Sequence, residues 1–331
     1  MHGGAWRDPA QSSECFLPTL NRLLITHIGS PPHSKFIDHI AGIASINYRL
    51  SPYTSHPTDP SLPTDRSRNA KHPDHINDVR LALNWLRTNY AVGGPPPPDA
   101  SYGTVKTDSP TVGTLKSAGY YDWIGIGHSC GATLLLQYVS HVGLGIEIPS
   151  LEYTPRFLGP KALILLEGIY SIRGLLDNHS PPKWAGPPKF TQIYADFLSA
   201  AFGPLSKDWD CASPNLLDYT EEAWPQGKLI VLCHSDDDEL VEWEQVLYMV
   251  DKLQDCGWLV TQPDGTGLRR VGDGEYDEER ASAQGKATLG ERNVIVRKLK
   301  GGHDEIWEDG REIARVISGC IFEHMAQDPY E

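Results

Sequence analysis

The chain has 331 residues, of which 40% are hydrophobic, and a formal net charge of −14 at pH 7. This length and apolar content allow one or two domains with a buried core, while the acidic balance argues against nucleic acid or an anionic membrane surface as a partner. No apolar run is long enough to span a bilayer. The six cysteines are scattered without a C-x-x-C pair, which is typical of reduced thiols in a cytoplasmic enzyme.

Apolar runs bounded by turn residues alternate with helical patterns along the chain. This alternation predicts βαβ units, and therefore an α/β fold with a mostly parallel central sheet and helices on both faces. Strands are expected at 41–49, 122–127, 161–170, 227–234 and 293–298. Helices are expected at 77–89, 132–142, 242–253 and 305–325.

Three polar segments interrupt this pattern, and we expect each to be a flexible loop inserted into one domain. They are 52–71, rich in Pro, Ser, Thr and Asp; 93–117, which begins with Gly-Gly-Pro-Pro-Pro-Pro; and 262–292, which is Gly-rich and densely charged. Their composition offers little apolar surface for packing. Because strands of one sheet lie on both sides of these loops, residues 1–331 are expected to form a single domain.

The chain opens with Met1-His2-Gly3-Gly4-Ala5-Trp6. A His-Gly-Gly loop is the type that supplies backbone N–H groups to the oxyanion hole of α/β-hydrolases, where it follows the third strand of the sheet. Here no strand precedes the loop. An inner strand without its neighbour would leave N–H and C=O groups unpaired. We therefore expect the natural protein to begin some tens of residues upstream, with a strand directly before His2.

A nucleophile elbow is predicted at Gly127-His128-Ser129-Cys130-Gly131, a G-x-S-x-G match. The match lies between an expected buried strand and an apolar helix, which is the context that such an elbow requires. The glycines permit a sharp turn that presents the Ser129 hydroxyl at the helix N-terminus. The N–H of Cys130 would then face the developing oxyanion. The strand, the helix and the upstream glycine loop disfavour an ordinary turn serine.

The catalytic acid is expected after the strand at 227–234, because the order in this fold is serine, acid, histidine. Asp238 is the first choice, since its spacing before the apolar Leu240-Val241 step matches the usual acid loop. Asp236 and Asp237 remain open as competitors. The alternative for each of the three is a solvated loop carboxylate.

The catalytic base is expected on the loop after the last strand. Of the thirteen histidines, His303 falls between the strand at 293–298 and the final helix, next to two glycines. His234 is better explained as part of the acid loop. The pattern His72-x-x-His75 is explained as the start of a helix rather than as a ligand set with Asp78, so no metal and no other cofactor is expected.

Six segments together resemble the arylformamidase, or N-formylkynurenine formamidase, family. They are HGGAW at 2–6, NYRLSP at 47–52, GHSCGAT at 127–133, EGIYSI at 167–172, HSDDDEL at 234–240 and GGHDEIW at 301–307. The resemblance implies an α/β-hydrolase that converts N-formyl-L-kynurenine to L-kynurenine and formate, and a small-molecule substrate as its partner. It also suggests a homodimer.

By the same resemblance the triad is Ser129, Asp238 and His303, and the oxyanion hole is formed by N–H groups near Gly3, Gly4 and Cys130. Trp6 and Tyr170 are candidates for an aromatic substrate pocket, with core packing as the alternative for both. Two other functions stay open. One is a carboxylesterase of the hormone-sensitive-lipase type, and the other is an inactive hydrolase fold or truncated fragment.

Overall fold

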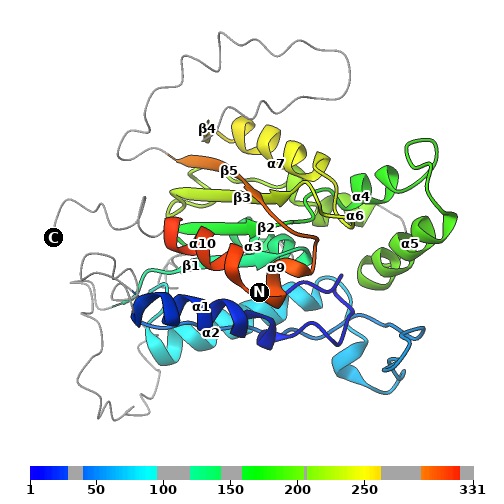
Figure 1. The fold of residues 1–331 in the computed structure, drawn as a ribbon, viewed down its shortest axis with the longest axis horizontal. Helices are drawn as coiled ribbons and strands as arrows, with labels where there is room; N and C mark the ends of the chain where they lie inside the picture. The colour runs from blue at the N-terminus through cyan, green and yellow to red at the C-terminus, as the bar shows by residue number, and fades with distance from the viewer. Residues whose placement is uncertain (29–39, 95–119, 143–158, 205–206, 262–291, 321–331) are drawn as a thin grey trace, which may run out of the picture.

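The computed structural model describes residues 1–28, 40–94, 120–142, 159–204, 207–261 and 292–320 (Figure 1). Within these ranges a five-stranded parallel sheet has the order β1-β2-β3-β5-β4. The strands are β1 (Ile124–His128), β2 (Ala162–Leu166), β3 (Leu229–Ser235), β4 (Leu259–Thr261) and β5 (Asn293–Leu299). The expected parallel α/β sheet is therefore confirmed.

Helices precede and separate the strands. The α-helices are α1 (Leu17–Ile28), α2 (Asp74–Tyr90), α3 (Cys130–Val139), α4 (Ile172–Asn178), α5 (Pro188–Phe202), α6 (Lys207–Ala212), α7 (Glu244–Asp255), α9 (Glu305–Glu308) and α10 (Arg311–Cys320). Short 3-10 turns are η1 (Ser13–Phe16), η4 (Arg66–Arg68) and η5 (Pro214–Leu216). No helix in the described part of the chain has the length and apolar character needed to cross a membrane.

Each face of the sheet has its own apolar core, because successive side chains of a strand point to opposite faces. Leu163 and Leu165 of β2 join one core with residues of α2, α3 and α7. Ile164 and Leu166 join the other with residues of α1, α9 and α10, and α10 crosses in front of the sheet in Figure 1. Burial on both faces explains why β2 is a continuous apolar run.

The expected strand at 41–49 is wrong: residues 40–50 form no strand in the structure. Their backbone groups bind loops and side chains instead, as when the N–H of Leu50 donates to Ser67 O at 2.7 Å. The edge of β1 is engaged by Met1, whose amino group donates to Ile126 O at 2.8 Å and whose carbonyl accepts from His128 N at 3.2 Å. Segment 40–50 pairs with no strand in the described part of the chain.

The expected single helix at 305–325 is also wrong, because Gly310 divides it into α9 and α10. Gly310 has a φ of 67°, and a side-chain carbon there would collide with the backbone of Pro18 and Thr19. This left-handed residue ends α9 and lets the start of α1 approach closely. Residues 321–325 lie outside the described residues.

The first expected insertion is described, and the other two are largely outside the described residues. Segment 52–71 contains η4 and is held by backbone hydrogen bonds, including Ser61 N to Tyr53 O at 3.1 Å and Ala70 N to Leu50 O at 2.9 Å. The expected loops at 93–117 and 262–292 lie almost wholly outside the described ranges.

Candidate active site

Ser129 stands on a strained turn between β1 and α3. Its φ of 51° and ψ of −124° are uncommon for a residue with a side chain, and such strain often marks functional sites. The turn is too tight for larger residues, since a side-chain carbon at Gly127 would lie 2.7 Å from Gly131 O. One at Gly131 would lie 2.6 Å from the carbonyl oxygens of Met1 and His2. The glycines of the motif are thus explained by close packing of the elbow.

Asp238 and His303 form a hydrogen-bonded pair at the same edge of the sheet. His303 Nδ1 lies 2.9 Å from Asp238 Oδ2, and the other carboxylate oxygen accepts from the N–H groups of Leu240 at 2.9 Å and Val241 at 2.8 Å. Burial acts to raise the pKa of Asp238, but His303 and the backbone donors outweigh it, so the pKa lies below its ordinary value. A buried, charged carboxylate thus faces the imidazole.

The two competing carboxylates of the acid loop have other surroundings. Asp236 is exposed and pairs with Lys298 at 2.8 Å, and it also accepts from Trp243 Nε1 at 2.7 Å. Asp237 is exposed as well. Of the three candidate aspartates, the structure therefore brings Asp238 to the His303 imidazole.

The glycine loop at the start of the chain packs directly on the elbow. A side-chain carbon at Gly3 would lie 3.0 Å from Ser129 Cβ, and Gly4 has a φ of 90°. The N–H of Trp6 donates to Cys130 Sγ at 3.3 Å, which joins the loop to the first residue of α3. Burial raises the pKa of the Cys130 thiol to about 11, so this sulfur is neutral. Gly3 and Cys130 thus lie beside Ser129, and Gly4 is the next residue of the same loop.

Trp6 and Tyr170, the two candidate pocket residues, are both fully buried. Trp6 packs edge-on against Phe202 with ring centroids 4.9 Å apart. Tyr170 folds over Gly168, where a side-chain carbon would lie 2.5 Å from its hydroxyl. Both belong to the apolar core in this structure, which favours the packing alternative for each.

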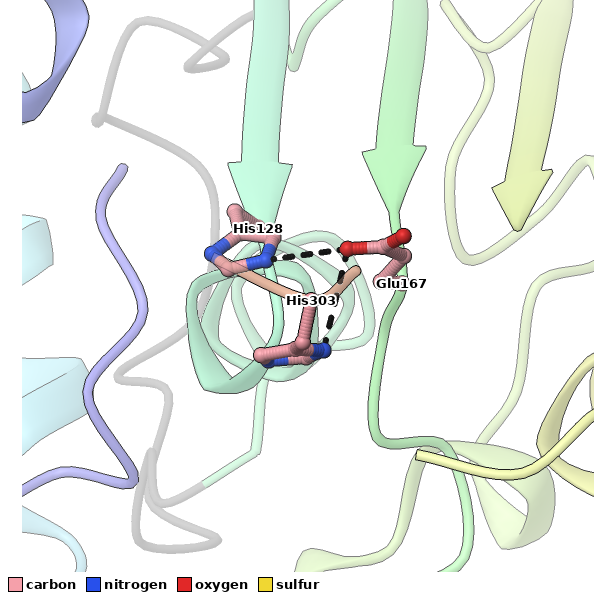
Figure 2. A group of neighbouring side chains, drawn as sticks. All are labelled: His128, Glu167 and His303. Carbon is pink, nitrogen blue, oxygen red and sulfur yellow. Dashed lines mark ion pairs between the residues drawn. The ribbon is translucent and has the colours of Figure 1, made fainter. Parts of the chain in front are cut away.

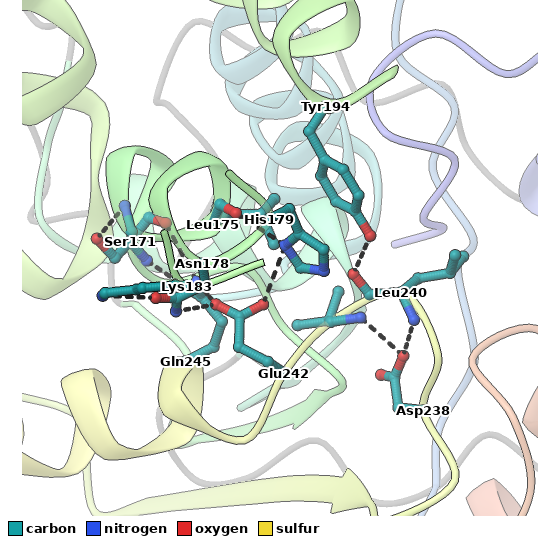
Figure 3. A network of polar contacts seen from close by, with 12 residues as sticks. Ser171, Leu175, Asn178, His179, Lys183, Tyr194, Asp238, Leu240, Glu242 and Gln245 are labelled. Atoms are coloured by element: carbon teal, nitrogen blue, oxygen red, sulfur yellow. Dashed lines mark hydrogen bonds and ion pairs between the residues drawn. The ribbon is translucent and has the colours of Figure 1, made fainter. Parts of the chain in front are cut away.

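A polar network holds the acid loop to the segment after β2, and its members Tyr194, His179 and Gln245 are not indicated by any sequence motif (Figure 3). Tyr194 of α5 donates to Leu240 O at 2.5 Å and stacks on His179 with ring centroids 3.9 Å apart. Gln245 of α7 accepts from the N–H groups of Tyr170 at 2.8 Å and Ser171 at 2.7 Å. Helices far apart in sequence thereby fix the loop that carries Asp238.

Glu167 is the functional candidate that the sequence did not indicate by itself. It follows the last residue of β2, is 0% exposed, and has a φ of 48°. Figure 2 shows Glu167 and His128 at the tips of neighbouring strands, with His303 facing both. A lone acid directly after a wholly apolar strand is the signal that could have revealed it.

Two groups of histidine and acidic residues are candidates for metal binding. His75 Nε2 lies 2.9 Å from Ser51 Oγ, and Asp78 binds Arg49, so these residues of the first pattern have separate partners. Among the described residues, the ligand atoms of His128, Glu167 and His303 lie within 4.8 Å of one another. The hydrogen bond to Asp238 already occupies the His303 nitrogen of that group, as expected for a triad.

The chain is similar to several known hydrolases. The kynurenine formamidase-like hydrolase fscH of Fusarium equiseti is 31% identical over 322 residues, which cover 97% of this chain and 81% of that protein. Kynurenine formamidase avaC of Aspergillus versicolor is 32% identical over 258 residues, covering 74% and 71%. A solved truncated carbohydrate esterase from gut microbiota shares 16% identity, with coverage of 96% and 83% and a TM-score of 0.44. No family model matches the chain.

Proposed function

The chain belongs to the kynurenine formamidase family of α/β-hydrolases, and from this premise we propose that it hydrolyses N-formyl-L-kynurenine to L-kynurenine and formate. The observation that carries the proposal is the 2.9 Å hydrogen bond between Asp238 and His303, at the sheet edge where Ser129 stands on its strained turn. A nucleophile, an oriented base and a glycine loop are the parts that acyl transfer requires.

The proposed reaction has two halves with one base. His303 takes the proton of Ser129 while the serine oxygen attacks the formyl carbon, and the negative oxygen is bound by N–H groups of Gly3, Gly4 and Cys130, each contributing about 3 kcal/mol in comparable sites. The C–N bond then breaks as His303 protonates the departing aryl amine, which leaves a formyl ester on Ser129. Water, deprotonated by His303, attacks this ester and releases formate.

The tight packing of the glycine loop on the elbow supports a very small acyl group. A carbon added at Gly3 would approach Ser129 Cβ to 3.0 Å, so little space separates the loop from the nucleophile. A formyl carbon carries only hydrogen besides its two heteroatoms. An acetyl group adds a methyl to this crowded side.

Substrate selectivity tests the proposal. We expect kcat/KM for N-formyl-L-kynurenine to exceed that for N-acetyl-L-kynurenine by about 10–200-fold, the usual discrimination against one extra methyl group. p-Nitrophenyl acetate serves as the activated ester for comparison, with the Ser129→Ala variant as the blank for all three substrates. A chain that hydrolyses the ester but leaves N-formyl-L-kynurenine intact would contradict the proposal and favour the carboxylesterase alternative.

A further inference from the structure

A buried carboxyl group that the proposed mechanism does not use lies beside the acid–base pair. Glu167 Oε2 is 3.4 Å from His128 Nε2 and 3.7 Å from His303 Nδ1 (Figure 2). Neither of its oxygens has a hydrogen-bond partner among the described residues. The backbone fixes the group, since the N–H of Glu167 donates to Cys233 O at 2.8 Å. The Glu167 carboxyl group is therefore held beside Asp238 and His303 without a hydrogen bond of its own among the described residues.

The titratable groups around Glu167 come from every segment packed against it. They are His128 of the elbow, Asp238 and Glu239 of the acid loop, His303 and Asp304 of the last loop, and Tyr170 and Cys233 behind it, while His2 and the chain's amino group act on His128. Within the described ranges, the basic groups that lie within 4.0 Å of its carboxylate are the two imidazoles of His128 and His303. Acidic groups thus predominate near Glu167.

Glu167 and Asp238 are two carboxyl groups at one imidazole, and their bonding differs. Asp238 accepts from two backbone N–H groups and from His303, which stabilise its negative charge. Glu167 is as buried but has no such donors, and an ionised carboxylate buried without hydrogen bonds is unfavourable. Burial, with the nearby charges of Asp238, Glu239 and Asp304, raises the pKa of Glu167 to about 10. Burial also lowers the pKa of His128 well below its usual value.

We infer that Glu167 is a positioning residue that acts as a neutral carboxylic acid. Its hydroxyl group faces His128 Nε2, and this pair supports the His303 ring, since the two imidazole centroids lie 4.5 Å apart. Asp238 then remains the single negative group that contacts the His303 imidazole. A second negative charge would bind the imidazolium proton more tightly and hinder its transfer to the leaving amine. The inference rests on the proposed role of His303 as the base.

Two substitutions separate a neutral from an ionised Glu167. Glu167→Gln keeps the shape and neutrality of the protonated acid, so we expect kcat within about threefold of wild type and an unmoved acid limb of the pH profile. Glu167→Met keeps the volume but removes the polar group. We expect a loss of about 10–100-fold in kcat with KM little changed, as for other buried groups that orient a functional histidine.

Both outcomes are read on p-nitrophenyl acetate as well as on N-formyl-L-kynurenine. Failure of the formamide substrate alone would refute the proposed function and leave this test intact. The inference is overturned if Glu167→Gln lowers kcat and moves the acid limb to lower pH, because an ionised Glu167 is then required. It is overturned equally if Glu167→Met matches wild type, because no positioning role then exists.

Stability against pH provides a test that needs no activity. The folded pKa of Glu167, about 10, lies above its ordinary 4.5, so its contribution to stability is fully present below about pH 4.5 and is lost as pH rises toward about 10. Glutamine has no such loss. The melting temperature of Glu167→Gln relative to wild type should therefore rise steadily between about pH 5 and about pH 9. A constant or falling difference would contradict a neutral Glu167.

Discussion

Asp238 and Asp236 stand two residues apart in one loop, yet their side chains have opposite surroundings. The Asp238 side chain is 0% exposed and contacts His303, while that of Asp236 is 62% exposed and contacts Lys298. Two backbone N–H groups hold Asp238 in place, and the loop itself is fixed by Tyr194 of α5. Hydrogen bonding rather than residue type therefore distinguishes the two carboxylates.

Asp238→Asn is expected to lower kcat by about 10⁴-fold, because an amide does not hold the imidazole in the required tautomer. Asp236→Asn is the matched control, and we expect it to stay within about twofold of wild type, since an exposed ion pair contributes little. Steady-state kinetics on N-formyl-L-kynurenine distinguish the two variants. Equal losses in both, or none in either, would show that Asp238 is not the acid.

Asp238→Asn is also expected to change how the stability of the chain depends on pH. The folded pKa of Asp238 lies below its ordinary 3.8, so its stabilising contribution is present above about pH 4 and is lost as pH falls through the folded pKa. The melting temperature of Asp238→Asn should therefore fall below that of wild type at neutral pH, and the difference should shrink toward about pH 3.

At the scale of single residues, the sequence predicts those that a motif or a loop position identifies. Ser129 lies within a recognisable pentapeptide, and His303 follows the last strand. Glu167 is visible in the sequence as a lone acid after an apolar run, but the sequence does not show that it lies between two loops that are distant from each other along the chain. The motifs of Trp6 and Tyr170 allow either substrate contact or core packing, because burial is a property of the folded chain that a motif does not reveal.

At the scale of elements, backbone contacts decide where the predicted patterns stop. The apolar periodicity after β5 continues through Gly310, but the chain turns there because the start of α1 approaches its backbone. Segment 40–50 has the composition of a strand but pairs with no strand in the described structure. Both errors arise because a local pattern does not say what lies next to it.

Gly310→Ala is expected to destabilise the chain by about 2–3 kcal/mol, since the added carbon meets both an unfavourable φ and the backbone of α1. Gly257→Ala is the control for conformation alone. Gly257 has a φ of 82° with no atom within 4 Å of the added carbon, so a cost of about 1 kcal/mol is expected. Urea unfolding of both variants compares them, and a Gly310→Ala cost no larger than that of Gly257→Ala would refute the close-approach explanation.

At the scale of the whole molecule, the sheet order explains how distant residues meet. Ser129 follows β1, Glu167 follows β2, Asp238 comes after β3 and His303 comes after β5. Carboxyl ends of parallel strands share one edge of a sheet, so the four loops converge there. The sequence predicted the positions of Ser129, Asp238 and His303 at strand ends because buried parallel strands are continuous apolar runs. It placed Glu167 inside the expected strand at 161–170, whereas β2 ends at Leu166. The sequence analysis does not predict the helices α4, α5 and α6; α4 and α6 are short, with 7 and 6 residues, and give a weak periodic signal.

The central claim is that Ser129 of this chain cleaves the formamide bond of N-formyl-L-kynurenine. Its most direct test is the rate of L-kynurenine release by wild type and by Ser129→Ala at equal concentration. Ser140→Ala serves as the control, since Ser140 lies at the opposite end of α3 from Ser129 and its hydroxyl donates to Leu136 O at 2.8 Å. We predict turnover by wild type and by the control, and a loss of about 10⁴-fold or more in kcat for Ser129→Ala. Release of L-kynurenine at the wild-type rate by Ser129→Ala, or none by wild type, would contradict the claim.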